Sequence, residues 1–297
     1  GRGVLLGSGS GLAKLSNLVI NVSNTDGSSD WGSNIWNQGG NAVLNNITID
    51  GVVDGAEIIA INGNETVTFN NLRFTNNDGK MYFQHAPNVI FNNCTVFNNT
   101  RQMNFQGTAG SSVSITNSIF LSSMDIAQYT TVNIENSCVL TDYVDYGINN
   151  IDADPLFVDA ANGDYRLSDY SPAIGAGTST VAPTTDIEGN QRPNPEGSNP
   201  DMGAYESSLG VYIPKPTLVT VNQDGSALFT NITDAVSWAS SGDTILISPG
   251  TYQETIELVD ADLHLASYYL TTGDTSFIST TIIDGMNQDS PIYIRAS

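Results

Sequence analysis

The sequence predicts an all-β protein built as a parallel β-helix, which should be right-handed because parallel crossovers favour that hand. Three observations lead to the prediction of a parallel β-helix. A motif of alternating apolar residues around one asparagine recurs along the first half of the chain. The copies lie about two dozen residues apart, close to one coil of such a solenoid. The composition, with 28 glycines and only 13% charged residues, suits strands joined by tight turns.

The repeat predicts a ladder of inward-facing asparagines. Its six segments read AKLSNLVI, AVLNNITI, VTFNNLRF, VIFNNCTV, VSITNSIF and VNIENSCV. The asparagines are separated by 29, 25, 22, 24 and 19 residues and are Asn17, Asn46, Asn71, Asn93, Asn117 and Asn136. Period-2 alternation predicts strands, and stacked coils would place these amides in one column at a turn. Stacked amides bond one another, and asparagine tolerates left-handed backbone angles.

The two cysteines are predicted to be free thiols. The repeat places Cys94 at an inward position and Cys138 at an outward position two coils away. Coils about 4.8 Å apart would separate them by about 10 Å, beyond the Cα limit of about 7 Å for a disulfide.

The middle of the chain resembles a known class of segment. Four blocks, DPLFVD, GDYRLSDYSPAIGAG, DIEGNQRP and DMGAYE, occur in order between residues 152 and 206. Together they resemble the choice-of-anchor segment that follows the coils in secreted bacterial β-helix repeat proteins. The resemblance implies that 151–207 forms a C-terminal cap for coils in 1–150, that the protein is extracellular or on a bacterial surface, and that no single activity can be assigned.

The last third resembles the opening of pectin-lyase-like β-helices. The stretch VTVNQDGSALF is followed by an amphipathic pattern over Ile232, Ala235, Val236 and Trp238 to Ala239, then by GDTILISPGTYQETI. The resemblance implies that this helix plugs the first open coil, where apolar core and backbone would otherwise be exposed. We therefore expect 208–297 to be an N-terminal cap with the first coils of a β-helix.

The chain therefore has its caps in an unusual order, and its two ends are expected to form a joint between units. Residues 208–297 would start a β-helix that residues 1–150 of another unit complete. The expected joint residues are Gly1, Val4, Leu5, Leu6, Leu12, Ile283, Ile292 and Ile294. Two interpretations remain open, namely tandem units in one polypeptide and separate subunits stacked head to tail.

Catalytic patterns are weak in this sequence. The string NTDG at 24–27 is similar to the first acidic motif of polygalacturonases, but we expect a turn there because no paired aspartates, Gly-His-Gly or Arg-x-Lys follow. A lyase would need clustered aspartates for calcium and an arginine base. Arg73 is expected at an outward strand position and Arg101 in a loop. The acids of the coils are scattered, and we expect surface solvation for Asp50, Asp54, Asp78 and Asp125. We expect structural or surface roles for His85 and His264.

Two binding hypotheses concern calcium and glycans. Calcium is the only cofactor that the sequence suggests, and its candidate ligands are Asp152, Asp154, Asp159 and Asp186. We favour turn-forming roles over metal binding for these four residues. The long first interval carries Trp31 and Trp36, whose rings suit stacking on sugars. Packing against a neighbouring coil or subunit is the favoured alternative for both tryptophans.

The charge narrows the classes of partner. A net charge of -22 repels nucleic acid and anionic membrane surfaces, and no apolar run has the length of a membrane span. Acidity with three lysines resembles secreted bacterial surface proteins. The leading hypothesis is an extracellular structural protein whose copies join head to tail into a filament or stalk. The alternatives are an adhesin or glycan-binding module and a polysaccharide lyase or hydrolase.

Overall fold

The structure is a computed structural model of the chain, and it forms two compact units, Gly1–Pro214 and Lys215–Ser297. Each unit is described by itself. The residues whose structure is described are 4–6, 12–20, 35–37, 39–52, 57–62, 66–85, 88–259, 262–286 and 290–295. None of the described helices combines the length and apolar content needed to cross a bilayer.

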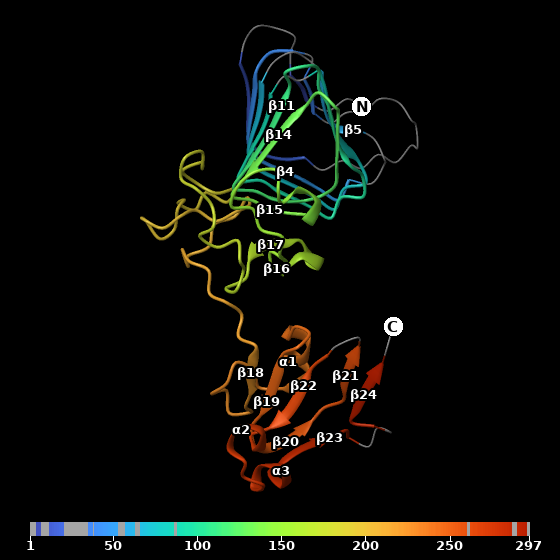
Figure 1. Cartoon of the computed structure of the whole chain (residues 1–297), viewed down its shortest axis with the longest axis vertical. Helices are drawn as coiled ribbons and strands as arrows, with labels where there is room; N and C mark the ends of the chain where they lie inside the picture. Colours follow the sequence, from blue (N-terminus) through green and yellow to red (C-terminus); the bar gives the residue numbers. More distant parts are fainter. Residues whose placement is uncertain are drawn as a thin grey trace. The chain divides into compact units, whose positions relative to one another are not determined.

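The first unit consists mainly of parallel strands that alternate between two sheets and curl around a common core (Figure 1). The first sheet contains β1 (Val4–Leu6), β3 (Ile35–Asn37), β5 (Glu57–Asn62), β7 (Lys80–Gln84), β10 (Met103–Gln106) and β13 (Met124–Ile126). The second contains β2 (Ala13–Ile20), β4 (Ala42–Asp50) and β6 (Thr66–Thr75), after which it continues as two rows. One row consists of β8 (Asn88–Asn92), β11 (Ser112–Thr116) and β14 (Thr131–Glu135). The other row consists of β9 (Thr95–Phe97), β12 (Ile119–Leu121) and β15 (Cys138–Val139). The prediction of a mainly β, parallel-stranded protein is confirmed.

The core of the first unit is built from columns of equivalent side chains. Phe69 of β6 pairs in register with Phe91 of β8, and their rings stack with centroids 4.9 Å apart. Phe83 of β7 stacks on Phe105 of β10 at 5.0 Å. Because each strand places the same residue of its alternating pattern inward, successive coils bury apolar groups on one another.

The six repeat asparagines occupy one turn position on successive coils. Their φ angles lie between 50° and 59°. The Asn46 amide donates to Asn17 Oδ1 at 2.8 Å, and the Asn71 amide donates to Asn46 Oδ1 at the same distance. The next column, Leu18, Ile47 and Leu72, pairs in register as the repeat implies.

Further asparagine ladders lie beside this one and were not predicted. The residue before each early repeat asparagine forms its own row, in which Asn70 donates to Asn45 at 2.8 Å and Asn92 donates to Asn70 at 3.0 Å. At a different turn, Asn98 donates to Asn76 at 2.8 Å, and both have positive φ. The Asn-Asn dipeptides at 45–46, 70–71, 76–77, 92–93 and 98–99 therefore each contribute to a ladder.

Residues 151–209, which we call the lateral segment, lie along the side of the coils. They include the antiparallel strands β16 (Phe157–Asp159) and β17 (Asp164–Leu167) and the short 3-10 helix Ala160–Asn162. Four ladder amides, on Asn71, Asn93, Asn117 and Asn136, donate to its carbonyls. The expected cap is therefore fixed across several coils rather than over the last coil alone.

The last coil of the first unit is covered by residues 141–151, which begin with the 3-10 helix Thr141–Tyr143. Ile134 N–H donates to Tyr146 O at 3.1 Å, and Val139 N–H donates to Ile151 O at 3.0 Å. The Tyr143 hydroxyl accepts from Met124 N–H at 2.8 Å. Backbone groups that would otherwise be unpaired at this edge are thereby satisfied.

The second unit begins with a capped coil. Its strands form three short parallel ladders, which are β18 (Leu218–Val221), β19 (Thr244–Ile247) and β22 (His264–Ser267), then β20 (Gly250–Gln253) and β23 (Thr281–Asp284), then β21 (Ile256–Val259) and β24 (Ile292–Arg295). The predicted helix is present as α1 (Ile232–Trp238), with Ile232 and Ala235 buried. Two short helices, α2 (Tyr269–Thr272) and α3 (Ser276–Thr280), were not predicted.

Position 117 allows the contribution of the ladder to be measured. Asn117 is fully buried, its amide donates to Thr178 O at 2.7 Å, and its carbonyl accepts from Thr178 N–H at 2.8 Å. We expect Asn117→Ala to reduce the local unfolding free energy by about 2–4 kcal/mol, from lost hydrogen bonds and backbone strain. Asn117→Gly should recover about 1 kcal/mol of this because glycine tolerates positive φ.

Hydrogen exchange of the peptides around residues 112–139 would measure both effects. The control is Asn133→Ala, an exposed strand asparagine, which should change the free energy by less than about 0.5 kcal/mol. Equal effects of Ala at positions 117 and 133 would contradict the importance of the ladder.

Candidate functional site

Each unit has one end closed by its own chain and one end where strand edges are unpaired among the described residues. In the first unit, residues 141–151 close the downstream end, after the last coil. In the second unit, α1 and a parallel bridge from Phe229 to Val221 of β18 close the upstream end. The open ends are therefore upstream in the first unit and downstream in the second.

The open edge of the second unit consists of β22, β23 and β24. Within the described part of the chain each pairs on one side only, with β19, β20 and β21 respectively. Ile283 and Ile292 are half-buried and pack on the core of this unit. Ile294 is 79% exposed although its strand partner, Leu258, is buried. The column of inward-facing side chains that contains Leu258 therefore ends at an isoleucine that is exposed.

The open edge of the first unit consists of β1 and β2, which pair on one side with β3 and β4 in the described residues. Val4, Leu5 and Leu6 pair in register with residues 35–37. On β2, Leu15 is buried, whereas Leu18 is 37% exposed although its partner Ile47 is fully buried.

Two further residues expected at the joint are Leu12 and Gly1. Leu12, just before β2, is 53% exposed. Gly1 lies outside the described residues. Apolar residues at inward positions of both open edges are thus incompletely covered, and this is the most distinctive feature that the two ends share.

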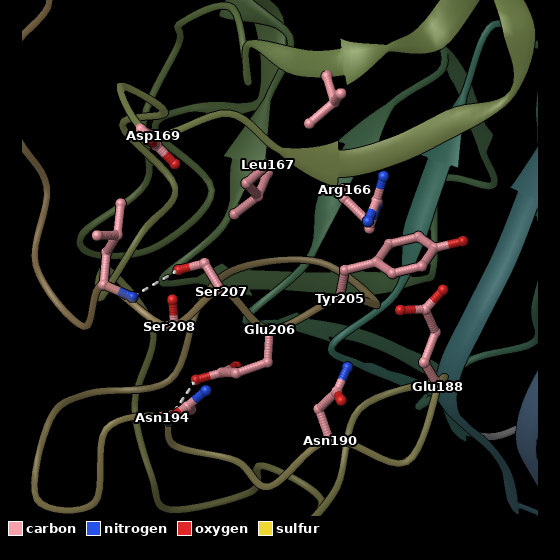
Figure 2. Close-up of a pocket in the computed structure, with 12 residues that line it drawn as sticks. Arg166, Leu167, Asp169, Glu188, Asn190, Asn194, Tyr205, Glu206, Ser207 and Ser208 are labelled. Atoms are coloured by element: carbon pink, nitrogen blue, oxygen red, sulfur yellow. Dashed lines mark hydrogen bonds between the residues drawn. The ribbon is translucent and has the colours of Figure 1, made fainter.

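A polar pocket lies within the lateral segment. Its volume is about 520 Å³, and Figure 2 shows Glu188 and Asn190 on one side and Asp169 on the other. The remaining lining residues are Val158, Arg166, Leu167, Asn194, Tyr205, Glu206, Ser207, Ser208 and Leu209. Several of the polar groups already have partners, because Arg166 bonds Asp164 at 2.5 Å and the Tyr205 hydroxyl accepts from Arg73 at 3.1 Å.

Glu206, which lines this pocket, belongs to a fully buried ion pair. Arg192 Nε lies 2.7 Å from Glu206 Oε2, and both side chains have no exposed surface. Arg192 also donates to Asn71 Oδ1 of the ladder at 2.8 Å and to Gly203 O at 3.2 Å. Glu206 accepts from Asn194 N–H at 3.0 Å. The pair thereby connects the lateral segment to the coils.

Two carboxyl groups of this region have shifted pKa values. Burial, assisted by the nearby Asp201 carboxylate, raises the pKa of Glu206 from 4.5 to about 6. Burial also raises the pKa of Asp201. Two buried carboxylates share the single guanidinium of Arg192, so uptake of a proton by one of them lowers the excess negative charge.

The four calcium candidates act separately as acceptors in turns. Asp186 accepts from the backbone N–H groups of Glu188 and Asn190 at 2.9 and 2.8 Å. Asp159 caps the 3-10 helix Ala160–Asn162, Asp154 accepts from Leu156 N–H, and Asp152 accepts from Thr141. Over the described ranges no three metal-ligating side chains come together.

The surface solvation expected of Asp50 is incomplete, because Arg73 and Asp50 are paired. These residues form a pair at 3.1 Å with side chains 17% and 28% exposed, because the lateral segment covers them. Asp50 also accepts from Thr75 at 2.8 Å and Asn76 at 3.0 Å. The pair stabilises the contact between the coils and the lateral segment.

The other candidates of this group lie apart from that pair. Arg101 and Asp78 form an exposed pair at 3.6 Å, and Asp125 accepts from Asn104 at 2.8 Å. His85 is exposed, has a φ of 58° and contacts Asn62, while His264 is exposed on β22. Asp54 and residues 24–27 lie outside the described residues.

The cysteines are free thiols, as predicted, and both are buried. Cys94 belongs to the coil core, whereas Cys138 packs with Leu167, Ala173 and Met202 of the lateral segment. The outward position assigned to Cys138 is therefore not exposed, because the lateral segment covers it. Burial raises the pKa of each thiol to about 12.

The glycan candidates remain a prediction. The backbone of Trp36 belongs to β3, where it pairs with Leu5 and Ala60. Trp31 lies outside the described residues.

Comparisons with known proteins give no relative for this chain. No protein-family model, curated protein or solved structure matches it.

Because the ion pair is buried, replacing Arg192 by an uncharged residue should strongly destabilise this region. In Arg192→Met, Glu206 loses its counter-ion in a buried site, and we expect the local unfolding free energy of residues 186–206 to fall by about 3–5 kcal/mol. Arg166→Met is the matched control, since its pair with Asp164 is exposed and should matter little. Hydrogen exchange of these peptides measures both, and similar protection in the two variants would contradict the prediction.

The raised pKa of Glu206 predicts a loss of stability with rising pH. Below pH 4.5 both folded and unfolded chains hold this proton, whereas between 4.5 and about 6 only the folded chain does. The unfolding free energy should therefore fall by about 2 kcal/mol as pH rises through this window, and stay lower above it.

Urea unfolding followed by pulsed hydrogen exchange of residues 186–206 would test this pH dependence. Glu206→Gln, which cannot titrate, should lack the Glu206 component while keeping the background from other acids. The same slope in both proteins would assign the effect to other groups.

Proposed function

We propose that this chain is an extracellular structural protein of a bacterial surface, whose copies join head to tail into a filament or stalk. In this proposal the open end of the second unit of one copy continues into the open start of the first unit of another. The continuous structure would be a right-handed parallel β-helix, the hand that parallel crossovers favour. The observation that carries the proposal is the complementary pair of open ends.

The direction of the strands supports this arrangement. In the second unit new strands are added on the downstream side, from β18 to β19 to β22, and in the first unit from β1 to β3 to β5. A downstream edge meeting an upstream edge keeps every strand parallel. Two identical ends meeting face to face would require antiparallel pairing, so the geometry favours an open, repeating contact over a closed dimer.

The closed ends also support it. In the second unit, α1 packs Ile232 and Ala235 on the core, and Phe229 bonds the edge strand through Thr220 O at 3.3 Å and Asn222 N–H at 2.8 Å. In the first unit, residues 141–151 bond to backbone groups of the last coil. Natural sheets cover or charge their exposed edges because unpaired strands template association. Unpaired strand edges with partly uncovered isoleucine and leucine residues are suited to association by strand addition.

The location and non-enzymatic character of the proposal rest on the sequence and on the coil face. The 152–206 blocks resemble segments of secreted bacterial proteins, and the acidic, lysine-poor composition agrees with a surface protein. Arg73 and Asp50, candidates for chemistry on the coil face, are bonded to each other.

Assembly can be tested with one substitution and a matched control. Ile294→Asp places a carboxylate on the proposed inward column and should abolish end-to-end polymers, because a buried unpaired charge is costly. Ile148→Asp changes another exposed isoleucine, 62% exposed at the closed end of the first unit, and should leave polymers intact.

Analytical ultracentrifugation over a concentration series and negative-stain electron microscopy would record the polymers. A wild-type chain that stays monomeric throughout, or polymers in Ile294→Asp equal to wild type, would reject the proposal.

A further inference from the structure

The two open edges carry enough pattern to define how they meet. We infer that β24 of one copy pairs in register with residues 18–20 of a second copy, so that Ile292 faces Leu18 and Ile294 faces Ile20. In the same joint, β23 pairs with residues 13–16, which places Ile283 beside Leu15. This inference rests on the proposed function, and it adds the partner residues and their register.

The position of the turn supports this register. In the first unit the strand of the second sheet bends at Asn17, after Ser16, and resumes at Leu18. In the second unit the equivalent strands are β23, which ends at Asp284, and β24, which begins at Ile292. Aligning the two bends pairs 281–284 with 13–16 and starts the next pairing at Ile292 and Leu18.

The inward columns support the same alignment. Ile256 and Leu258 of β21 are buried and pair with Ile292 and Ile294, so these two isoleucines occupy inward positions. On β2 the residues paired with fully buried Ile47 and Ile49 are Leu18 and Ile20. The inferred register therefore stacks four apolar side chains in two continuous columns.

A different register would break these columns. A slip by one residue would turn the apolar set of one strand to the outer face, because side chains alternate along a strand. Ile294, 79% exposed, would then stay in water, and Val19 would replace Ile20 in the column.

Charge agrees with the inferred register. When Ile283 pairs with Leu15, Lys14 pairs with Ile282. Lys14, which is exposed, then lies diagonal to Asp284 on the outer face. Diagonal neighbours on adjacent strands lie about 7–8 Å apart, within reach of a lysine side chain. A lysine of the upstream edge thus meets an aspartate of the downstream edge.

Disulfide trapping between separate chains tests this register. One full-length chain carries Ile294→Cys and the other carries Ile20→Cys; they are mixed, oxidised with copper phenanthroline and separated on a non-reducing gel. Adjacent coils about 4.8 Å apart satisfy the Cα range of a disulfide. The pair Ile292→Cys with Leu18→Cys should behave in the same way.

Two mismatched pairs serve as controls. Ile294→Cys with Leu18→Cys represents a slip by two residues, and Ile294→Cys with Val19→Cys represents the opposite face. We expect about tenfold less cross-linked dimer from each, since separations beyond about 7 Å or diverging Cβ directions prevent bridging. The native thiols, buried with pKa values raised to about 12, should give no dimer in wild-type protein.

The outcomes separate the inference from the proposed function. Polymers that cross-link best through a mismatched pair would overturn the register and leave head-to-tail assembly standing. A chain that forms no polymers and no cross-linked dimer would overturn both. A double variant, Ile294→Cys with Ile20→Cys, that oxidises only within single chains would also overturn an intermolecular joint.

Discussion

Backbone pairing between successive parallel strands is the interaction on which the rest of this structure depends. A strand at the end of such a stack has one row of N–H and C=O groups without strand partners. These groups must form hydrogen bonds with other partners, such as water, a capping segment or another strand. This chain uses a helix and a bridge in the second unit and the stretch 141–151 in the first. The upstream edge of the first unit and the downstream edge of the second have no strand partner among the described residues.

Asparagine makes the stack compatible with tight bends. Its side chain is short enough for positive φ, and its amide both donates and accepts, so a column of asparagines satisfies itself from coil to coil. The ladder also offers donors to the side, and four of its amides use them on carbonyls of the lateral segment. One residue type thus forms the bend, links the coils and attaches residues 151–209.

The sequence repeat predicted the features that recur in every coil, but it did not predict the structure of the segment that has no repeat. The six asparagines, the inward column after them and α1 follow from local pattern, because each coil repeats the same environment. The lateral position of residues 151–209 did not follow, since it depends on contacts such as Arg192 with Asn71, more than a hundred residues apart in sequence. The same contacts explain why Cys138, Arg73 and Asp50 are covered rather than solvated.

The lateral segment links successive coils of the first unit. By bonding to Asn71, Asn93, Asn117 and Asn136, it connects coils that would otherwise interact only with their neighbours. Coils tied in this way cannot open one at a time without breaking bonds to the segment. Its buried Arg192–Glu206 pair costs desolvation but is geometrically specific, and it fixes where the segment attaches. In the proposed assembly, these bonds would help to hold the upstream strand edge in the regular register that strand addition requires.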